Sequence, residues 1–312
     1  MCSEQPELNV PSGHCSGPDM AIRALVTGEK KARLAFLPTL VLGILAGVYI
    51  GFGGNVFTIA KDTPGLPFGV QQLLCGLMFS LGLILVVIGG AELFTGNTLI
   101  SMAWLSGRVT TRQLLRNWAI VYLGNLIGSL ILVWLVYGAA QYLMDDKHLG
   151  EMAVKIAATK CSLPFMVVLY RGILCNALVC LAVWLCYSCS STTDKILAII
   201  FPITAFIAGG FEHCVANMYL IPMGMAIKAA GLGAADPNIA KLTMSGFIGN
   251  LIPSTIGNII GGAIMVGGVY WVAYVLPHKD LPTGRLGASP RRRHRDAAAA
   301  HRPHANTDDA EQ

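Results

Sequence analysis

The sequence predicts an all-α membrane protein whose six transmembrane helices form an inverted repeat of three plus three, with helices two and five broken. Three observations support this prediction. Hydrophobic residues make up 54% of the 312-residue chain and charged residues only 12%, about half the charged share of soluble domains. The charges leave six long apolar stretches between them, and two motifs from the first half of the chain recur in the second.

Each apolar stretch is long enough to cross a bilayer, which takes about 20 residues in a helix. Five stretches contain no formal charge, and the remaining one contains Glu212 and His213 near its middle. We therefore expect transmembrane segments in six regions: residues 34–60, 63–91, 117–144, 172–193, 196–227 and 242–278.

The flanking charges predict the orientation of the chain. The leading segment is polar and lacks the apolar core and small-residue cleavage site of a signal peptide, so the first span should be retained. Positive charges cluster before span one and between spans two and three, at Lys30, Lys31, Arg33, Arg108, Arg112 and Arg116. Because positive loops stay on the cytoplasmic side, we expect both termini in the cytoplasm.

Cysteines give no sign of a metal or redox centre. The chain has nine, and most lie inside the spans, where cysteine serves as a small apolar residue. Cys186 and Cys189 form a lone CxxC at a predicted helix end, a weak pattern by itself. We predict no cofactor and no metal.

Two motifs repeat along the chain. Residues 89–97 match residues 209–217 in a Gly-Gly pair, a glutamate and an asparagine, and Gly-Asn-x-Ile-Gly at 124–128 recurs at 257–261. The copies lie in spans two and five and in spans three and six. Because three crossings separate them, the second copy must run through the membrane in the opposite direction, as in an inverted-topology repeat.

The first motif predicts a break in spans two and five. Adjacent glycines followed by Glu92 or Glu212 interrupt apolar sequence in both, although glycine costs a helix about 1 kcal/mol relative to alanine and a glutamate at this depth costs more. A broken helix presents free N–H groups and a positive dipole end at midplane, which suit an anion. For Gly128, Gly261 and Gly262, close helix packing is the simpler interpretation.

Several polar side chains fall within the spans. His213 is the only histidine in an apolar stretch, and its place in a broken helix favours a functional role over a satisfied core histidine. We expect Glu92 and Glu212 to accept hydrogen bonds from N–H groups freed by the breaks, and Thr95 to offer its hydroxyl to an anion. Arg171 requires Glu212 or Glu92 as a partner, or must extend to an interface.

Three strings, at 92–99, 210–218 and 250–258, resemble the formate–nitrite transporter family, and the resemblance extends over roughly residues 20–277. It implies six helices per protomer in an aquaporin-like outline, broken second and fifth helices, and a homopentamer with one pore in each protomer. By position, His213 resembles the central pore histidine and Thr95 the threonine of the second-helix loop.

The resemblance also assigns the remaining site residues. Phe79 with Phe206, and Leu83 with Leu93, resemble two apolar constrictions. Asn176 resembles an asparagine near the histidine and Lys160 a lysine of the outer vestibule, where Cys161 to Pro164 replace the histidines that bacterial members often carry. We add Asn217 to the substrate pathway, and we expect the helix breaks to be supported by Glu92, Gly96, Asn97 and Glu212.

The predicted organisation is a cytoplasmic N-terminal segment at 1–33, a transmembrane transporter domain at 34–277 and a disordered basic cytoplasmic tail at 278–312. The tail contains Arg291 to Arg293 and Arg295 without apolar periodicity. Such a tail meets anionic lipid most simply, and we expect no nucleic-acid partner. The predicted location is a plasma membrane or a bacterial inner membrane.

We predict transport of small monovalent anions such as formate, lactate, acetate and nitrite. Because stripping water from an anion is costly, proton-coupled transport is expected, with the neutral acid crossing the constrictions and His213 donating or relaying the proton. One alternative is a neutral-solute channel of aquaporin type, although paired Asn-Pro-Ala motifs are absent. Another is a membrane-embedded enzyme that uses Glu212 and His213, with Cys214 as a metal ligand.

Overall fold

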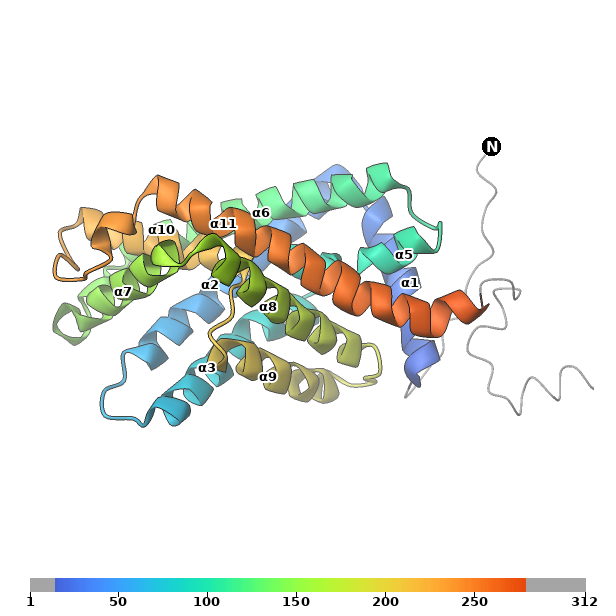
Figure 1. Cartoon of the computed structure of the whole chain (residues 1–312), viewed down its shortest axis with the longest axis horizontal. Coiled ribbons are helices and arrows are strands. Elements are labelled where there is room, and N and C mark those ends of the chain that lie inside the picture. The colour runs from blue at the N-terminus through green and yellow to red at the C-terminus, as the bar shows by residue number, and fades with distance from the viewer. Residues whose placement is uncertain (1–14, 279–312) are drawn as a thin grey trace, which may run out of the picture.

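The computed structural model describes residues 15–278, and these residues form helices and connecting turns without a strand (Figure 1). Apart from His278, the predicted basic tail lies outside the described residues, as do residues 1–14. Five described helices are long and apolar enough to cross a membrane: α2 (Phe36–Lys61), α3 (Phe68–Ile88), α6 (Thr111–Gly138), α8 (Phe165–Cys186) and the helix Met244–Val275. The last begins as α11 (Met244–Ile259) and continues in wider π-helical turns, η4 (Ile260–Gly268) and η5 (Trp271–Val275).

Both predicted interruptions are present. The fifth predicted span consists of two shorter helices, α9 (Thr192–Ala208) and α10 (Cys214–Ala229), joined by five non-helical residues. The first half of the second span is α3, and its second half consists of two short helices, α4 (Phe94–Asn97) and α5 (Ile100–Leu105). Its second half lies beyond the predicted range 63–91, because the charge-free run from which we predicted the span stops at Glu92. The count of six crossings stays a prediction.

Two amphipathic helices occupy opposite ends of the molecule (Figure 1). Helix α1 (Gly17–Arg33) lies against α5 and η5, and α7 (His148–Ser162) lies against α10. Helix α1 starts in a capping box, in which the Asp19 carboxylate accepts from the backbone N–H of Ser16. Neither helix was predicted from the sequence, because both are short and carry charges.

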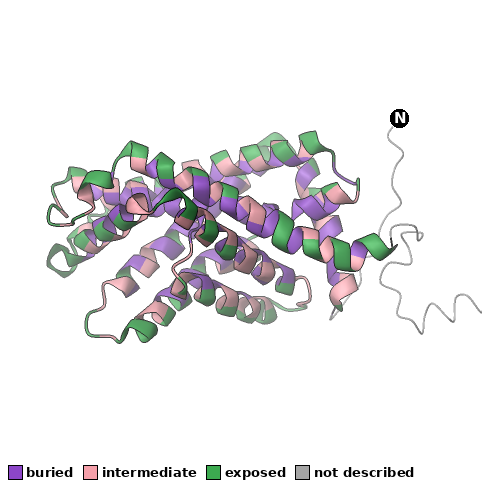
Figure 2. Ribbon diagram, viewed as in Figure 1, coloured by how far each residue is buried: buried purple, intermediate pink, exposed green. Residues whose placement is uncertain are grey.

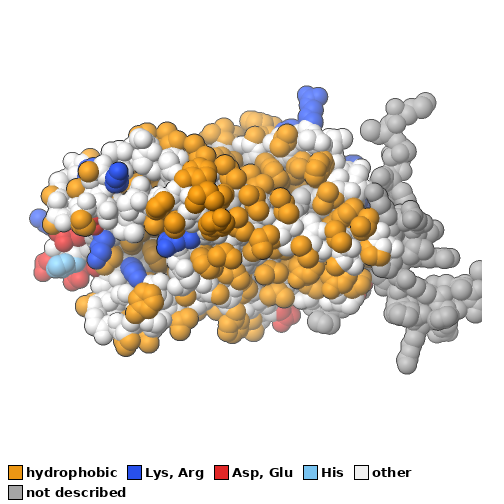
Figure 3. All heavy atoms as spheres, viewed as in Figure 1, with side chains coloured by type: hydrophobic (Ala, Val, Ile, Leu, Met, Phe, Trp, Pro, Cys, Tyr) orange, Lys and Arg blue, Asp and Glu red, His pale blue; other side chains and the backbone are white. Residues whose placement is uncertain are grey.

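Burial follows the pattern of a membrane protein. Large apolar side chains lie on the outside, including Phe68, Trp134 and Phe201 at 76%, 72% and 74% exposure, and Figure 3 shows orange hydrophobic surface across the middle of the molecule. The purple buried segments in Figure 2 line the interior. Several of the most buried side chains are polar: Thr95, Asn117, Asn125, Asn176, Asn217 and Asn258 are each at most 1% exposed. A soluble protein does not expose so much apolar surface.

Close helix packing accounts for the glycines of the second repeat motif. A Cβ on Gly128 would collide with the carbonyl oxygen of Ile44 in α2, and one on Gly261 would collide with that of Ile173 in α8. The packing interpretation is therefore confirmed for Gly128 and Gly261, and a Cβ on Gly262 would collide with the side chains of Thr98 and Asn176. Helices α2 with α6 and α8 with α11 form matching pairs in the two halves.

Candidate functional site

The two helix breaks meet at the centre of the molecule. Gly90 and Gly210 adopt left-handed backbone angles, with φ of 71° and 67°, which glycine adopts without strain. They turn the chain after α3 and α9, so that Leu93 and His213 become the N-cap residues of α4 and α10. The side chains of Thr95 and His213 then touch, with Oγ1 of Thr95 3.0 Å from Nε2 of His213.

The contacts of His213 define its tautomer. Its Nδ1 lies 3.0 Å from the backbone nitrogen of Ala216, which donates to it. A nitrogen that accepts a hydrogen bond carries no proton, so a neutral ring must carry its proton on Nε2. The Nε2–H therefore points to Thr95, and His213 presents a donor to the hydroxyl that faces it.

Asn125 holds the first break open. Its Oδ1 accepts the backbone N–H of Phe94 at 2.9 Å, and its Nδ2 donates to the carbonyls of Gly43 at 2.7 Å and Glu92 at 3.0 Å. One buried amide thus satisfies two backbone groups at the break, the Phe94 N–H and the Glu92 carbonyl, and ties the break to the carbonyl of Gly43 in α2.

Asn258 does the same at the second break. It accepts from the backbone N–H of Cys214 at 2.9 Å and donates to the carbonyls of Gly172 at 2.8 Å and Glu212 at 3.0 Å. We did not predict a role for Asn125 or Asn258. The signal was present, since both occupy the asparagine of the repeated Gly-Asn-x-Ile-Gly motif.

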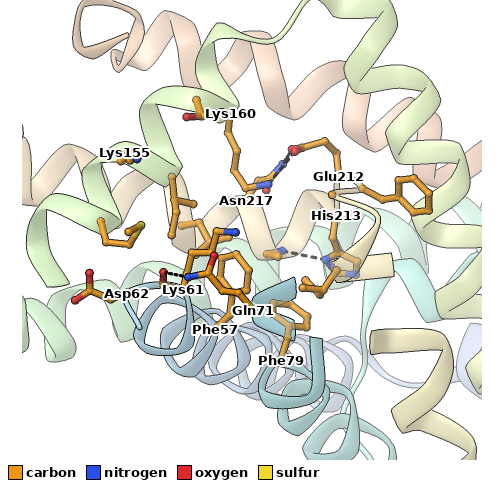
Figure 4. A pocket seen from close by; sticks show the side chains of 18 of the residues that line it. Phe57, Lys61, Asp62, Gln71, Phe79, Lys155, Lys160, Glu212, His213 and Asn217 are labelled. Atoms are coloured by element: carbon orange, nitrogen blue, oxygen red, sulfur yellow. Dashed lines mark hydrogen bonds and ion pairs between the residues drawn. The ribbon is translucent and has the colours of Figure 1, made fainter. Parts of the chain in front are cut away.

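The glutamate at each helix break forms an ion pair with a lysine. Glu92 lies 2.8 Å from Lys31 of α1, and Asn97 donates to its other oxygen at 2.6 Å. Glu212 lies 2.9 Å from Lys160 of α7, and Asn217 donates to it at 2.7 Å. Figure 4 shows the side chains of Lys160 and Glu212 pointing toward one another. We expected these carboxylates to accept backbone N–H groups. They accept side-chain donors instead, because Asn125 and Asn258 already accept the backbone N–H groups at the breaks.

Arg171 has no ion pair with Glu92 or Glu212, since lysines occupy both. Of the two possibilities that the sequence left open for Arg171, a glutamate partner or an interface, the ion pair with Glu92 or Glu212 is therefore ruled out. Its backbone carbonyl accepts the N–H of Glu212 at 3.3 Å, and the residue lines a cavity described below.

A further asparagine contacts the backbone of each ion-paired lysine. Asn117 donates to the carbonyl of Lys31, and Asn250 donates to that of Lys160, each at 3.0 Å. Lys31 was predicted only as a flanking charge. A repeat could have revealed it, because Lys31-x-x-Leu-x-Phe matches Lys160-x-x-Leu-x-Phe.

Asn176 lies on the Thr95 side of the His213–Thr95 contact. It donates to the carbonyl of Thr95 at 3.2 Å, to Oγ1 of Thr98 at 3.1 Å and to the carbonyl of Asn258 at 2.6 Å. It therefore links the first break to Asn258 of α11, the residue that supports the second break. Gly96 and Asn97 lie within α4.

Two cavities approach the central pair from opposite ends. The larger encloses about 920 Å³ and is lined by Phe79, Phe206 and His213, as Figure 4 shows for Phe79 and His213. The smaller encloses about 290 Å³ and is lined by Leu83 and Leu93. The large cavity includes residues of α7, and the small cavity includes residues of α1, so they lie toward different ends of the molecule.

A closed layer separates the cavities. The rings of Phe79 and Phe206 meet edge to face with centroids 5.5 Å apart, and the ring of Phe206 stacks on that of His213 at 6.0 Å. Leu83, Leu93 and His213 are each 2% exposed and Thr95 is fully buried. The structure thus places the predicted apolar residues on either side of one polar contact.

A membrane-embedded helical bundle, with two cavities facing one another across the junction of two broken helices, defines a channel or transporter for small solutes. The chain belongs to the formate/nitrite transporter family, whose model matches residues 18–272. Family membership places it among channels and transporters and not among enzymes, and it does not favour the aquaporin alternative.

Relatives and solved structures agree with this assignment. The formate channel FocA of Escherichia coli K12 is 43% identical over 265 residues, which cover 82% of this chain and 93% of FocA. A probable formate transporter of Methanothermobacter thermautotrophicus is 38% identical over 276 residues, covering 82% and 96%. A pentameric formate channel with formate bound has a TM-score of 0.71 at 44% identity, covering 76% of this chain and 96% of that one. A further ion channel of the family has a TM-score of 0.72 at 31% identity, with coverage of 82% and 98%.

Proposed function

We propose that the protein transports formate, and with it other small monovalent anions such as nitrite, acetate and lactate, across a membrane. The observation that supports this most strongly is the His213–Thr95 contact between two cavities that open toward opposite ends. The similarity to channels named for formate supports the choice of first substrate.

The proposed pathway runs from the large cavity to the small one. A solute passes Phe79 and Phe206, meets the hydroxyl of Thr95 and the Nε2–H of His213, and leaves between Leu83 and Leu93. Asn217 lines the large cavity, and Asn176 holds the carbonyl of Thr95. On this proposal, Glu92, Gly96, Asn97 and Glu212 support the shape of the breaks.

The form that crosses is the neutral acid. Moving an ion into an apolar constriction costs several kcal/mol even after relaxation. Protonating a carboxylate with a pKa near 4 at about pH 7 costs about 3 pKa units, or roughly 4 kcal/mol. The lower cost falls on protonation, so transport becomes proton-coupled: the falling dielectric along the cavity raises the pKa of the substrate until it takes a proton.

His213 contributes as a hydrogen-bond donor. A proton relay through the ring would have to load Nδ1, and this atom accepts the Ala216 N–H; relay therefore requires that bond to break. Donation from Nε2 through Thr95 requires no such rearrangement. We accordingly assign the proton to the solution in the cavity and the orientation of the acid to His213 and Thr95.

Charge in the large cavity favours anions at its mouth. Lys160 lines it but is balanced by Glu212. Counting all charged lining residues, four are cationic and three acidic, which leaves one net positive charge: Lys61, Lys155, Lys160 and Arg171 against Asp62, Asp145 and Glu212. A cavity with apolar walls concentrates the field of such a charge.

The proposed assembly is a homopentamer with a pore in each protomer, supported by the pentameric structural relative and by the broad apolar surface in Figure 3. The proposed orientation places both termini in the cytoplasm, with lipid around the exposed helices. The first and last described residues lie at the α1 end, where Lys30, Arg33 and Arg108 also lie.

Uptake into vesicles tests this function. Purified protein in liposomes should take up labelled formate faster than protein-free liposomes, and His213→Phe should abolish most of the increase while eluting as the same oligomer. Nitrite, acetate and lactate in the same assay rank the substrates. No uptake of any of them by folded protein would overturn the proposal.

A further inference from the structure

The small cavity contains three charged side chains, and two of them cancel. Lys31 and Glu92 lie 2.8 Å apart, and both line the cavity. The third is Lys195, from the first turn of α9. The lining therefore carries one net positive charge, which belongs to Lys195.

Lys31 is held in place through both its ammonium group and its backbone carbonyl. Its ammonium donates to Glu92 and, at 2.9 Å, to Oδ1 of Asn97, and its carbonyl accepts from Asn117. A lysine whose charge is neutralised and whose donors are occupied contributes little field beyond its own pair. Its contacts make it a positioning residue for Glu92 and the start of α4.

Lys195 is different. Within residues 15–278 its ammonium has no ion pair and no hydrogen-bond acceptor, and the residue is half-buried. The adjacent acid, Asp194, is exposed and turned to the helix cap, where its carboxylate accepts the backbone N–H of Ser191 at 3.1 Å. The charge of Lys195 is thus available to a ligand in the cavity.

Other charges near this cavity are already engaged. Glu29 of α1 forms ion pairs with Arg33 and Arg108, and Arg23 donates to the carbonyl of Tyr187 at 2.8 Å. Tyr187 lines the cavity, but neither Arg23 nor Glu29 does.

We propose that Lys195 is the anion-collecting residue of the small cavity: it attracts the carboxylate or nitrite to that mouth, while Lys31 positions Glu92. This inference rests on the proposed function, since it names the group that receives the anion at one end of the pathway. Lys195 is a specificity-determining residue for charge, and the acid is still neutral when it passes Leu83 and Leu93.

Equilibrium exchange of labelled formate tests the proposal, because every molecule must pass the small cavity whichever way the protein inserts. In low salt, Lys195→Gln should raise the half-saturating formate concentration about fivefold, the effect of one unit charge at close range in water. The maximal rate should stay within about twofold, and high salt should remove the difference because it screens the charge. Lys195→Arg should have the half-saturating concentration of the wild type. Lys195→Glu should raise it further than Lys195→Gln does.

Two matched variants distinguish the electrostatic effect of a charge in the small cavity from that of a charge on the outer surface. Lys30→Gln removes an exposed lysine at the same end of the molecule that does not line the cavity, and it should leave half-saturation unchanged. Asp194→Asn keeps an acceptor for the helix cap but removes the negative charge beside Lys195, and it should lower the half-saturating concentration.

The inference is overturned if Lys195→Gln matches Lys30→Gln in low salt, if its effect persists in high salt, or if Lys195→Arg fails to restore binding. In each case wild-type exchange shows that the proposed function holds and that only the assignment of Lys195 fails. If folded wild-type protein exchanges no formate, the proposed function fails, and the inference fails with it.

Discussion

The Nε2 atom of His213 lies 3.0 Å from Oγ1 of Thr95, so one hydrogen bond joins residues 118 positions apart at the meeting of two broken helices. His213 caps α10, and Thr95 lies in the first turn of α4. In the repeat His213 corresponds to Leu93 and Thr95 to Val215, so one copy carries the histidine and the other the threonine. The centre of the pathway is therefore asymmetric, with a donor ring on one side and a hydroxyl on the other.

Thr95→Val should lower the maximal rate of formate uptake about tenfold, because it keeps the shape and removes the hydroxyl that receives His213 and meets the solute. The loss of one buried hydrogen bond corresponds to about 1 to 1.5 kcal/mol. Thr95→Ser keeps the hydroxyl and should retain most activity. Equal rates for the valine and serine variants in vesicles would contradict the assigned role.

Asn258→Leu should destabilise the protein by about 3 kcal/mol or more, because it leaves the Cys214 N–H and the Glu212 carbonyl buried without partners and removes the bond to the Gly172 carbonyl of α8. Asn125→Leu should cost a similar amount, because Asn125 makes the equivalent contacts. Thermal unfolding in detergent measures both. Asn238→Ala is the control, since the side chain of Asn238 makes no hydrogen bond within the described chain. A midpoint for either leucine variant equal to that of the control would refute the capping role.

Lys160→Gln should destabilise by about 3 to 5 kcal/mol, because it leaves the buried Glu212 without its cation. Lys160→Gln with Glu212→Gln should recover most of the loss. The comparison is a double-mutant cycle on the unfolding midpoint. Lys155→Gln is the matched control, because Lys155 lines the same cavity but is exposed and has no ion pair in the described chain. Additive effects of the two glutamine substitutions would show that the pair is not coupled.

Phe206→Ala should raise the ratio of lactate to formate uptake several-fold, because it opens the closed contact between Phe206 and Phe79. The wider passage should also admit partly hydrated anions and so weaken proton coupling. Phe201→Ala, on the exposed side of the same helix at 74% exposure, should leave the ratio unchanged. An unchanged ratio in Phe206→Ala would place the size filter elsewhere.

The architecture could be predicted from sequence patterns because the free-energy costs that these patterns indicate depend on the local sequence alone. A Gly-Gly-x-Glu segment in apolar sequence is expensive in any continuous helix, so the break is predictable without knowing its surroundings. The predicted positions of Phe79, Phe206, Leu83 and Leu93 around His213 rested on a family resemblance, and the structure brings these residues to the lining of the two cavities.

The partners of the buried charges were not predictable in the same way. Lys31 reaches Glu92 across 61 positions and Lys160 reaches Glu212 across 52, and only the packing of α1 and α7 on the core brings them together. Arg171, for which a glutamate partner and an interface were both open, pairs with neither Glu92 nor Glu212. Asn125 and Asn258 were visible as a repeat, but their hydrogen bonds to three backbone groups depend on neighbouring helices that the repeat does not specify.

Proton coupling is the central claim, and the driving force for uptake tests it most directly. Formate uptake into vesicles should accelerate when the outside is made more acidic than the inside, and it should not respond to a membrane potential imposed at equal pH, because the neutral acid carries no charge. Uptake that follows the imposed potential and ignores the pH gradient would show that the anion itself crosses the closed layer between the cavities.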